Sequence, residues 1–470
     1  MSKVYESAWW DGYNSWIVKH VSKLERAPFS FIYNGKHSDN FLHSWEVDKL
    51  EKKISKDLEK CTVIWFDRET GLKVSFEAIR FTKYPAIEWV VRFKNEGKEE
   101  TPVLEDIQAL DTIFSTSQGE FVLHGARGSF PENTDFAPVR KRISRNSKLD
   151  FHPKGGRPSD NYLPFFNLEW SNKGVMIYIG WSGQWLASFI RKDDSSLRVR
   201  AGMELTHLRL YPGEQIRTPS VLLLFWHGER LYGHNLMRRL ILKYYTPRNK
   251  DGLVQPPVAY SVHSLYYYNA TGEKNLIDFI KKLAKLNLGV ECVWLDAGWF
   301  RGGWPNGVGN WFPRKDFPRG LGPVADVAYK KGLKFLVWFE PERVHKGTWL
   351  DREHPEWIIK LRGVPNRLLD LGNDDARKWL TEHISNMIKK YGIDIYRNDF
   401  NIDPLPFWRS LDKPDRQGIA EIKYIEGLYA FWDELLKRHP NLIIDNCASG
   451  GKRIDLETIK RSVPLWRTDL

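Results

Sequence analysis

Alternating apolar and polar positions dominate the first half of the chain. Short runs rich in Val, Ile, Phe and Trp are separated by turn signals such as RETG at 68–71 and NEG at 95–97. The pattern predicts strands at 61–67, 73–80, 87–93, 103–115, 174–179, 184–190, 197–210 and 220–226. Strands spaced in this way without intervening helices predict an N-terminal antiparallel β-sandwich over residues 1–230.

The hydrophobic period changes near residue 230. A helical pattern at 231–245, followed by the Pro- and Gly-bearing stretch TPRNKDGLVQPP, predicts a helical linker over 231–257. Beyond it, strand and helix patterns alternate. Strands are predicted at 259–267, 290–295, 334–339, 393–398, 442–445 and 463–468, with helices at 274–286, 323–331, 375–391 and 418–438. This alternation is typical of a parallel sheet, open or closed.

The ends of these strands favour a closed sheet. No Gly-rich phosphate loop follows the first strand, which argues against an open dinucleotide-binding sheet. Nearly every strand instead ends in carboxylates, Trp or Asn, the residue types expected at the mouth of a (β/α)8 barrel. We therefore predict a multidomain chain, β then α/β, with a (β/α)8 catalytic barrel over 258–470.

Only six barrel strands are visible in the pattern, whereas the fold needs two more. We therefore expect a barrel that is incomplete at the C-terminus and stops after strand six, as in a truncated gene product. An open barrel leaves strand edges unpaired, so we expect the 470-residue chain alone to be weakly stable and inactive. The downstream reading frame would test this expectation.

A long polar stretch with Pro and Gly, residues 127–160, is predicted to be a loop. Loops of this length are often functional, so we expect it to cap a site. A second possibility is that it reaches a neighbouring copy in a homo-oligomer.

Composition narrows the function classes. The chain is 42% hydrophobic, too apolar for a disordered protein, and its net charge is 71 − 59 = +12. Lys and Arg are interspersed with acids, as in KLEKKISKDLEK at 49–60, so nucleic-acid binding is disfavoured. No apolar run of membrane-spanning length and no secretory signal are present, and three separated cysteines suit a reducing compartment. We expect a cytoplasmic protein without membrane partners. The 21 Trp residues suggest a flat-faced ligand such as a sugar.

The candidate chemistry lies at five strand ends. They read WLDAGWF at 294–300, VWFEPE at 337–342, YRNDFN at 396–401, DNCASGGKR at 445–453 and WRTDL at 466–470. A single acid after a strand is usually a helix cap, but barrel strand ends converge on one pocket. No zinc-ligand spacing, Walker loop, nucleophile elbow or kinase signature is present, so we predict no metal and no cofactor. Paired carboxylates among aromatic side chains fit glycoside hydrolysis.

These motifs, in this order, resemble glycoside hydrolase family 36, the α-galactosidase and α-N-acetylgalactosaminidase family. In the first half, YPAIEW at 84–89, PFFNLEW at 164–170 and GWSGQW at 180–185 resemble the family's N-terminal β-sandwich. The resemblance implies a retaining hydrolase that removes terminal α-linked galactose, or a galactose derivative, from oligosaccharides. The reaction would be a double displacement through a covalent glycosyl-aspartate.

The resemblance also implies residue roles. Asp399 matches the nucleophile and Asp469 the acid/base, with Asp399 ionised and Asp469 protonated before the first step. The remaining predicted substrate-binding residues are Asp296, Trp299, Trp338, Arg397, Asn401, Cys447, Gly450 and Arg453. Within this set, Asp296 would bind sugar hydroxyls, Trp338 would form an aromatic wall, and the Cys-x-x-Gly-x-x-Arg element would lie near the sugar's 2-position. For Cys447, a small buried residue is the alternative.

Two departures from the family pattern leave the sugar open. Ala297 replaces the second acid of Asp-Asp-Gly-Trp, and Arg397-Asn398 replaces Lys-Trp before the nucleophile. Arginine presents a planar fork where lysine presents a point charge. Glu340 or Glu342 is expected to brace the barrel mouth through Arg343 or Arg397. An α-N-acetylgalactosaminidase or galactosaminidase of the same family is one alternative activity. An inactive fragment or non-catalytic carbohydrate-binding relic, and an α-galactosyl transferase of the raffinose-synthase kind, are others.

Overall fold

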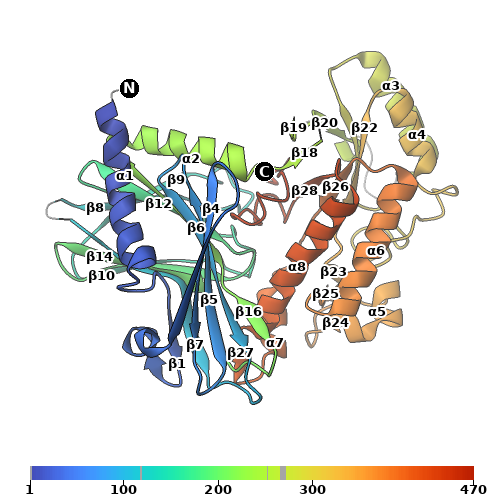
Figure 1. Ribbon diagram of the computed structural model, residues 1–470. Coiled ribbons are helices and arrows are strands. Elements are labelled where there is room, and N and C mark those ends of the chain that lie inside the picture. Colours follow the sequence, from blue (N-terminus) through green and yellow to red (C-terminus); the bar gives the residue numbers. More distant parts are fainter. Residues whose placement is uncertain (1–2, 117–118, 251, 265–270) are drawn as a thin grey trace.

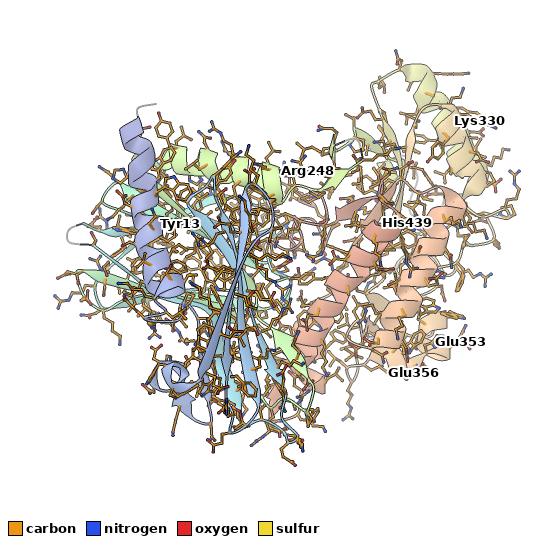
Figure 2. All side chains as sticks on the ribbon, in the orientation of Figure 1. Tyr13, Arg248, Lys330, Glu353, Glu356 and His439 are labelled. Carbon is orange, nitrogen blue, oxygen red and sulfur yellow. The ribbon has the colours of Figure 1, made fainter. Side chains whose placement is uncertain are left out.

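The computed structural model describes residues 3–116, 119–250, 252–264 and 271–470. A β-rich part, formed by the first half of the chain, lies beside an α/β part formed by the second half (Figure 1). The C-terminal segment lies between the two parts (Figure 1). In the α/β part, Lys330, Glu353 and Glu356 lie on the side that faces away from the β-rich part (Figure 2). Among the described residues, no helix has both the length and the apolar character needed to cross a membrane.

Two antiparallel sheets make up the β-rich part. The first has the order β10-β13-β14-β7-β1-β2, with β15 pairing to β7, and the second has the order β3-β4-β5-β6-β17-β12-β11-β8-β9, with β16 pairing to β6. In the first sheet the strands are β1 Ser30–Tyr33, β2 Lys36–His37, β7 Leu104–Ser115, β10 Ser147–Phe151, β13 Trp185–Arg191, β14 Ser196–Met203 and β15 His207–Leu208. In the second they are β3 Glu46–Lys53, β4 Leu58–Phe66, β5 Leu72–Phe81, β6 Ala86–Asn95, β8 Phe121–Ala126, β9 Pro138–Ile143, β11 Phe165–Trp170, β12 Lys173–Gly180, β16 Gln215–Arg217 and β17 Ser220–His227.

The predicted β-rich N-terminal region is confirmed. Strand β5 illustrates why: Leu72, Val74, Phe76 and Ala78 alternate with more exposed positions and point into the core. The core also contains fully buried aromatic side chains such as Trp89. Their burial removes large apolar areas from water, the main driving force for packing two sheets.

The pattern missed two features of this part. The predicted loop over 127–160 contains β9 and β10, so that prediction is wrong over these strands. Strand β9 has the sequence PVRKRI and is mostly exposed at a sheet edge, so it lacks the buried alternation that would reveal it. The other omission is α1, Lys3–Ile17, which continues as a π-helix over Val18–Ser22. Its Trp16 stacks on Trp89 with ring centroids 5.6 Å apart.

Helix α2, Arg230–Tyr244, and the hairpin of β18 (Arg248–Asn249) and β19 (Gly252–Leu253) connect to a parallel sheet. Its order is β20-β21-β22-β26-β28. The strands are β20 Ala259–Ser261, β21 Cys292–Leu295, β22 Lys334–Phe339, β26 Ile395–Asn398 and β28 Ile443–Asn446, and the helices between them include α3 Glu273–Leu286, α4 Gly322–Lys330, α6 Asp374–Tyr391 and α8 Ile419–Arg438. The predicted strand–helix alternation is therefore confirmed. Strands β21, β22, β26 and β28 are nearly continuously buried, as parallel strands usually are.

Smaller elements decorate this sheet. They are β23 Arg343–His345, β24 Ile358–Ile359 and β25 Asn366–Leu369, which pair with one another, together with α5 Trp349–Glu353, α7 Leu405–Leu411 and β27 Arg416–Gln417. They are short insertions that the sequence pattern did not predict. Strand β27 pairs with β15 of the β-rich part, so backbone hydrogen bonding joins the two halves of the chain.

The first and last predicted strands of the α/β part differ from expectation. Strand β20 ends at Ser261, and residues 265–267 of the predicted strand lie outside the described residues. At 463–468 the structure has a single bridge between Val463 and Asp445 in place of a strand. Pro464 follows at once and has no N–H to continue the ladder. The completeness of the barrel stays a prediction.

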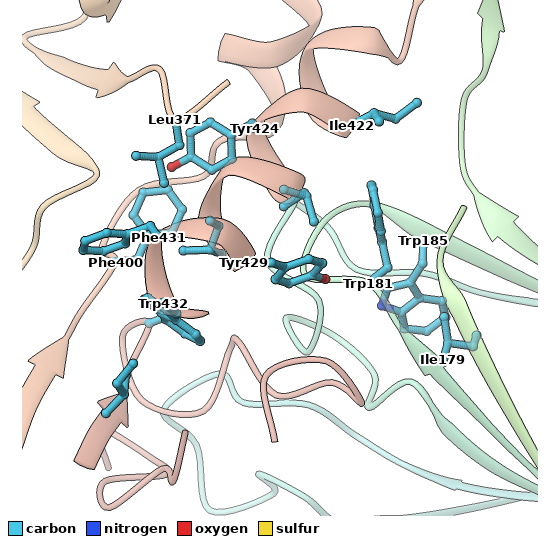
Figure 3. Packing of buried hydrophobic residues seen from close by; sticks show 14 of the residues in the cluster. Ile179, Trp181, Trp185, Leu371, Phe400, Ile422, Tyr424, Tyr429, Phe431 and Trp432 are labelled. Carbon is cyan, nitrogen blue, oxygen red and sulfur yellow. The ribbon is translucent and has the colours of Figure 1, made fainter. Parts of the chain in front are cut away.

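Helix α8 packs against the β-rich part. Tyr429 of α8 points toward Trp181 at the end of β12 (Figure 3). The Tyr429 hydroxyl accepts a hydrogen bond from the Ser182 backbone N–H at 3.0 Å, and the Trp181 indole N–H donates to Glu421 at 2.7 Å. The GWSGQW segment therefore fixes the β-rich part against the α/β part beside the strand ends.

Candidate active site

A cavity of about 490 Å³ opens at the carboxyl ends of the parallel strands. This is where (β/α)8 enzymes bind their substrates. It is lined by Ser261, His263, Trp294, Asp296, Ala297, Trp304, Trp338, Arg397, Asp399, Asn401, Cys447, Trp466 and Asp469. Seven predicted site residues therefore share one cavity: Asp296, Trp338, Arg397, Asp399, Asn401, Cys447 and Asp469.

Asp399, the first residue after β26, is buried and has hydrogen bonds to both carboxylate oxygens. Its Oδ1 accepts from the backbone N–H groups of Phe400 at 2.8 Å and Ser449 at 3.2 Å. Its Oδ2 accepts from the Trp338 indole at 3.0 Å and the Asn401 side-chain amide at 2.8 Å. Burial raises the pKa of Asp399, but the Arg397 charge and these donors outweigh it, so the pKa lies below the ordinary value.

Asp469 lies at the mouth of the same cavity, and the residue as a whole is exposed. Its Oδ1 accepts a hydrogen bond from the Trp466 indole at 3.0 Å. Loss of water around the carboxyl group and the negative charge of Asp399 raise the pKa of Asp469, whereas the Trp466 hydrogen bond lowers it in part. The two carboxyl groups therefore have pKa values displaced in opposite directions.

Arg397 supplies the positive charge beside Asp399. Its side chain is buried, its Nη1 donates to Asp445 at 2.5 Å, and its guanidinium lies 4.3 Å from the Trp294 ring centroid. Asp296, at the end of β21, accepts a hydrogen bond from the Ala297 N–H at 2.7 Å. Burial raises the pKa of Asp296, and the Ala297 N–H lowers it in part.

Aromatic side chains form the walls of the cavity. Trp338 meets Trp304 edge to face, with ring centroids 5.3 Å apart, and Trp294 meets Trp466 in the same manner at 5.8 Å. Trp338 presents an aromatic face to the cavity and donates a hydrogen bond to Asp399, so one side chain forms a wall and also holds the carboxylate.

Three predicted substrate-binding residues do not line the cavity. Trp299 is fully buried, and its indole donates to the backbone carbonyl of Trp338 at 2.9 Å. Arg453 is buried and donates to Glu342 at 2.6 Å. Gly450 has φ +79°, and a Cβ there would lie 3.0 Å from the Asp469 backbone N. Each of these residues lies behind the cavity lining. The prediction placed them in the lining because a position after a strand does not fix the direction of a side chain.

The two glutamates after β22 are fully buried braces. Glu340 accepts two hydrogen bonds from Arg343, at 2.7 and 2.5 Å, as expected. Glu342 pairs with Arg453, so the alternative brace through Arg397 is wrong. Glu340 also accepts a hydrogen bond from the backbone N–H of Asn401 at 2.7 Å, so it holds the segment that follows Asp399.

Sequence reasoning missed several lining residues. Ser261 is the last residue of the first parallel strand and His263 follows it, and the end of this strand was not weighed with the other strand ends. Trp304 comes from a loop after β21 that carries no periodic signal. Within the part of the chain that the structure describes, no group of three His, Cys, Asp or Glu side chains is arranged to hold a metal ion.

Comparisons with known proteins extend over both halves of the chain. A family model described as Melibiase matches residues 229–470. α-Galactosidase AgaA of Geobacillus stearothermophilus is 27% identical over 463 residues, covering 93% of this chain and 60% of that protein. α-Galactosidase Mel36A of Lactobacillus acidophilus is 26% identical over 453 residues, covering 91% of this chain and 58% of its own length. The chain thus spans about three-fifths of the length of these relatives.

Solved structures share the fold. The crystal structure of AgaA, a family 36 α-galactosidase, superposes with a TM-score of 0.79 at 22% identity, covering 94% of this chain and 65% of that one. An AgaA variant in complex with raffinose gives a TM-score of 0.78 at 22% identity, with the same coverage. The α-galactosidase of Lactobacillus brevis gives 0.78 at 21% identity, covering 94% of this chain and 62% of that one.

Proposed function

This chain belongs to the melibiase family, and we propose that it is a retaining glycoside hydrolase that removes terminal α-linked galactose from oligosaccharides. The resemblance to glycoside hydrolase family 36 that its motifs carry is confirmed by the family match. Its relatives are named α-galactosidases, and one of their structures holds raffinose, which supports an oligosaccharide substrate.

One observation carries the proposed mechanism: two carboxyl groups in one cavity have opposite surroundings. Asp399 accepts four hydrogen bonds and lies beside the Arg397 cation, which favours its ionised form. Asp469 accepts one hydrogen bond and is exposed to the negative charge of Asp399, which favours its protonated form. A retaining glycosidase needs this combination of an ionised nucleophile and a protonated acid.

In the proposed first step, an Asp399 oxygen attacks the anomeric carbon and forms a covalent β-galactosyl ester. The bond to the leaving oxygen breaks, and that oxygen takes the proton from Asp469. In the second step Asp469, now a carboxylate, removes a proton from water, whose oxygen attacks the anomeric carbon and releases Asp399. The product is galactose with the α configuration retained.

The remaining lining residues have supporting roles in this proposal. Asp296 and Arg397 would bind hydroxyl groups of the terminal sugar, and Trp338 would hold an apolar face of the ring. The Cys447 thiol beside Asp399 lowers the pKa of this carboxyl group further. A cytoplasmic location and assembly into a homo-oligomer belong to the same proposal, and the buried free cysteines suit a reducing compartment.

The proposal is tested by following hydrolysis of nitrophenyl α-galactoside by proton NMR. The 470-residue chain is assayed beside the full product of its reading frame, so that a need for any sequence outside these residues is not mistaken for absence of the chemistry. We expect α-galactose to form before its β anomer. First formation of the β anomer, or no hydrolysis by either protein, would contradict the proposal.

The sugar is tested with a panel of nitrophenyl α-glycosides that carry galactose, galactosamine and N-acetylgalactosamine. We expect the highest kcat/KM with galactose. A preference for a 2-amino or 2-acetamido sugar would move the proposal to the alternative activities of the family, and would connect Ala297 and Arg397 with the choice of sugar.

A further inference from the structure

A loop of the β-rich part reaches the rear of the candidate active site. Residues 152–164 connect β10 to β11 and lie between the segments that follow β26 and β28. The Leu405 N–H donates to the Gly155 carbonyl at 3.1 Å, and the Ser159 N–H donates to the Lys452 carbonyl at 3.0 Å. The Ser159 hydroxyl also donates to the Gly451 carbonyl at 2.6 Å. The loop is therefore fastened to both segments that surround Asp399.

Arg157 lies at the tip of this loop and is 6% exposed. Its Nη1 donates to the Phe400 carbonyl at 3.3 Å and to the Ser449 hydroxyl at 3.2 Å. Its Nη2 donates to Asp403 at 2.6 Å. One guanidinium thus joins the strand end after β26 to the strand end after β28. Only a planar fork with several donors can reach these acceptors together.

These contacts set the direction of a hydrogen-bond chain that ends on Asp399. Because Ser449 Oγ accepts from Arg157, its own proton is directed to Asn401 Oδ1, which lies 2.7 Å away. The Asn401 amide is then oriented with its Nδ2 toward Asp399 Oδ2, at 2.8 Å. A reversed amide would place an oxygen against the carboxylate, which is unfavourable.

The backbone at Ser449 is also constrained. Its φ is +49°, a left-handed conformation that non-glycine residues seldom adopt. In this conformation the Ser449 N–H donates to Asp399 Oδ1 at 3.2 Å. The Arg157 and Asn401 contacts to the Ser449 hydroxyl hold the residue in place, so two of the four hydrogen bonds on Asp399 depend on Ser449 and its partners.

We propose that Arg157 is a positioning residue for Asp399: the β-rich part supplies a guanidinium that orients Ser449 and Asn401 and thereby fixes the carboxylate. The catalytic consequence rests on the proposed function, whereas the geometric consequence does not. In this proposal the α/β part needs the loop of the β-rich part to hold Asp399 in place.

The geometric test compares crystal structures of the wild type and Arg157→Lys. Lysine keeps the charge and can pair with Asp403, but it cannot serve the Phe400 carbonyl and the Ser449 hydroxyl as well. We expect the Asn401 amide to turn or to withdraw beyond hydrogen-bonding distance of Asp399. Unchanged positions of Asp399, Asn401 and Ser449 in the variant would overturn the proposal, whatever the protein catalyses.

The catalytic test uses Arg217→Lys as the matched control. Arg217 is a second arginine that joins the β-rich part to the α/β part: its side chain is 10% exposed and donates to Glu457 at 2.9 Å. Its other contacts are with the Thr218 carbonyl and the Tyr429 ring, none of which donates to Asp399. Both variants are expected to lower the melting temperature. Only Arg157→Lys is expected to lower kcat/KM for nitrophenyl α-galactoside, by about 10- to 100-fold.

A pH profile separates positioning from loss of stability. Hydrogen bonds to the ionised carboxylate lower the pKa of Asp399, so their loss should move the acid limb of kcat/KM to higher pH in Arg157→Lys and not in Arg217→Lys. Equal effects of the two variants on the rate and on this limb would overturn the proposal. An inactive wild type would instead refute the proposed function, and the crystal structures would still decide the role of Arg157.

Discussion

The two candidate catalytic carboxyl groups belong to regions that are built differently. Asp399 follows a buried strand and accepts hydrogen bonds from Asn401 in its own segment and from Trp338 and Ser449 in two distant segments. Asp469 lies in an exposed segment without regular structure, and it accepts a hydrogen bond from Trp466, three residues away. The position of Asp399, the proposed nucleophile, is thus set by several segments of the fold, and that of Asp469, the proposed acid, is set mainly by its own segment.

This difference agrees with the demands of the two proposed roles. A nucleophile has to stay ionised and must approach one carbon along one direction, so a fixed, saturated carboxylate is suitable. An acid that later acts as a base has to exchange protons with a leaving group and with water, so an accessible carboxyl group is suitable. The comparison predicts different sensitivities to mutation in the two regions.

The largest effect is expected for Asp399→Asn. The amide keeps the shape of the side chain but cannot form the glycosyl ester, so kcat should fall by about 10⁴-fold or more. Initial rates with nitrophenyl α-galactoside measure this loss, with the exposed Asp433→Asn as control. A variant that kept the wild-type kcat would show that Asp399 is not the nucleophile, and the comparison of the two carboxyl groups would fail.

Asp469→Asn is expected to cost less and to depend on the leaving group. General acid catalysis contributes about 10²- to 10⁴-fold, and a nitrophenolate needs little protonation, so the loss should be larger with raffinose than with the nitrophenyl substrate. Rates on both substrates check this expectation. The same loss on both would show that Asp469 does not protonate the leaving group.

The residues that hold the two regions in place should also contribute differently to the stability of the protein. Glu342→Gln breaks a fully buried ion pair with Arg453, and it should lower the free energy of unfolding by about 3–5 kcal/mol. Thr468→Val, beside Asp469, removes one hydrogen bond to Asp135 and should cost about 1 kcal/mol. Urea unfolding of both variants compares the costs, and similar values would contradict the account.

The smallest effect is expected for Trp466→Phe. The indole hydrogen bond lowers the pKa of Asp469, so its loss should raise that pKa further. Because Asp469 has to be protonated for the first step, the basic limb of kcat/KM should move to higher pH, by about 0.5–1 unit for one hydrogen bond. A shift to lower pH, or movement of the acid limb alone, would argue against this assignment.

Sequence patterns predicted the fold best where burial and periodicity agree. Strand β22 occupies the predicted residues 334–339, and α6 and α8 begin and end within one residue of expectation. The pattern was wrong at 463–468, where Pro464 interrupts pairing, and it missed β9 because an exposed edge strand has no buried face. Hydrophobic periodicity indicates which strands are buried. It does not reveal exposed edge strands or the points where strand pairing is interrupted.

The candidate site was predictable in part for a similar reason. Strand ends identified Asp399 and Asp296, because parallel strands bring their carboxyl ends to one edge. They also suggested Trp299 and Arg453, which lie behind the cavity, because position along a strand does not give side-chain direction. Arg157 could not be predicted, since its contact with Ser449 joins residues separated by 292 positions.

Azide rescue tests the central claim, the assignment of the two carboxyl groups, most directly. Asp399→Ala and Asp469→Ala are incubated with nitrophenyl α-galactoside and sodium azide, and the products are identified by NMR. In the Asp399 variant azide should replace the nucleophile and yield β-galactosyl azide. In the Asp469 variant it should attack the glycosyl-enzyme and yield α-galactosyl azide. The opposite pairing of products, or the same anomer from both variants, would contradict the account.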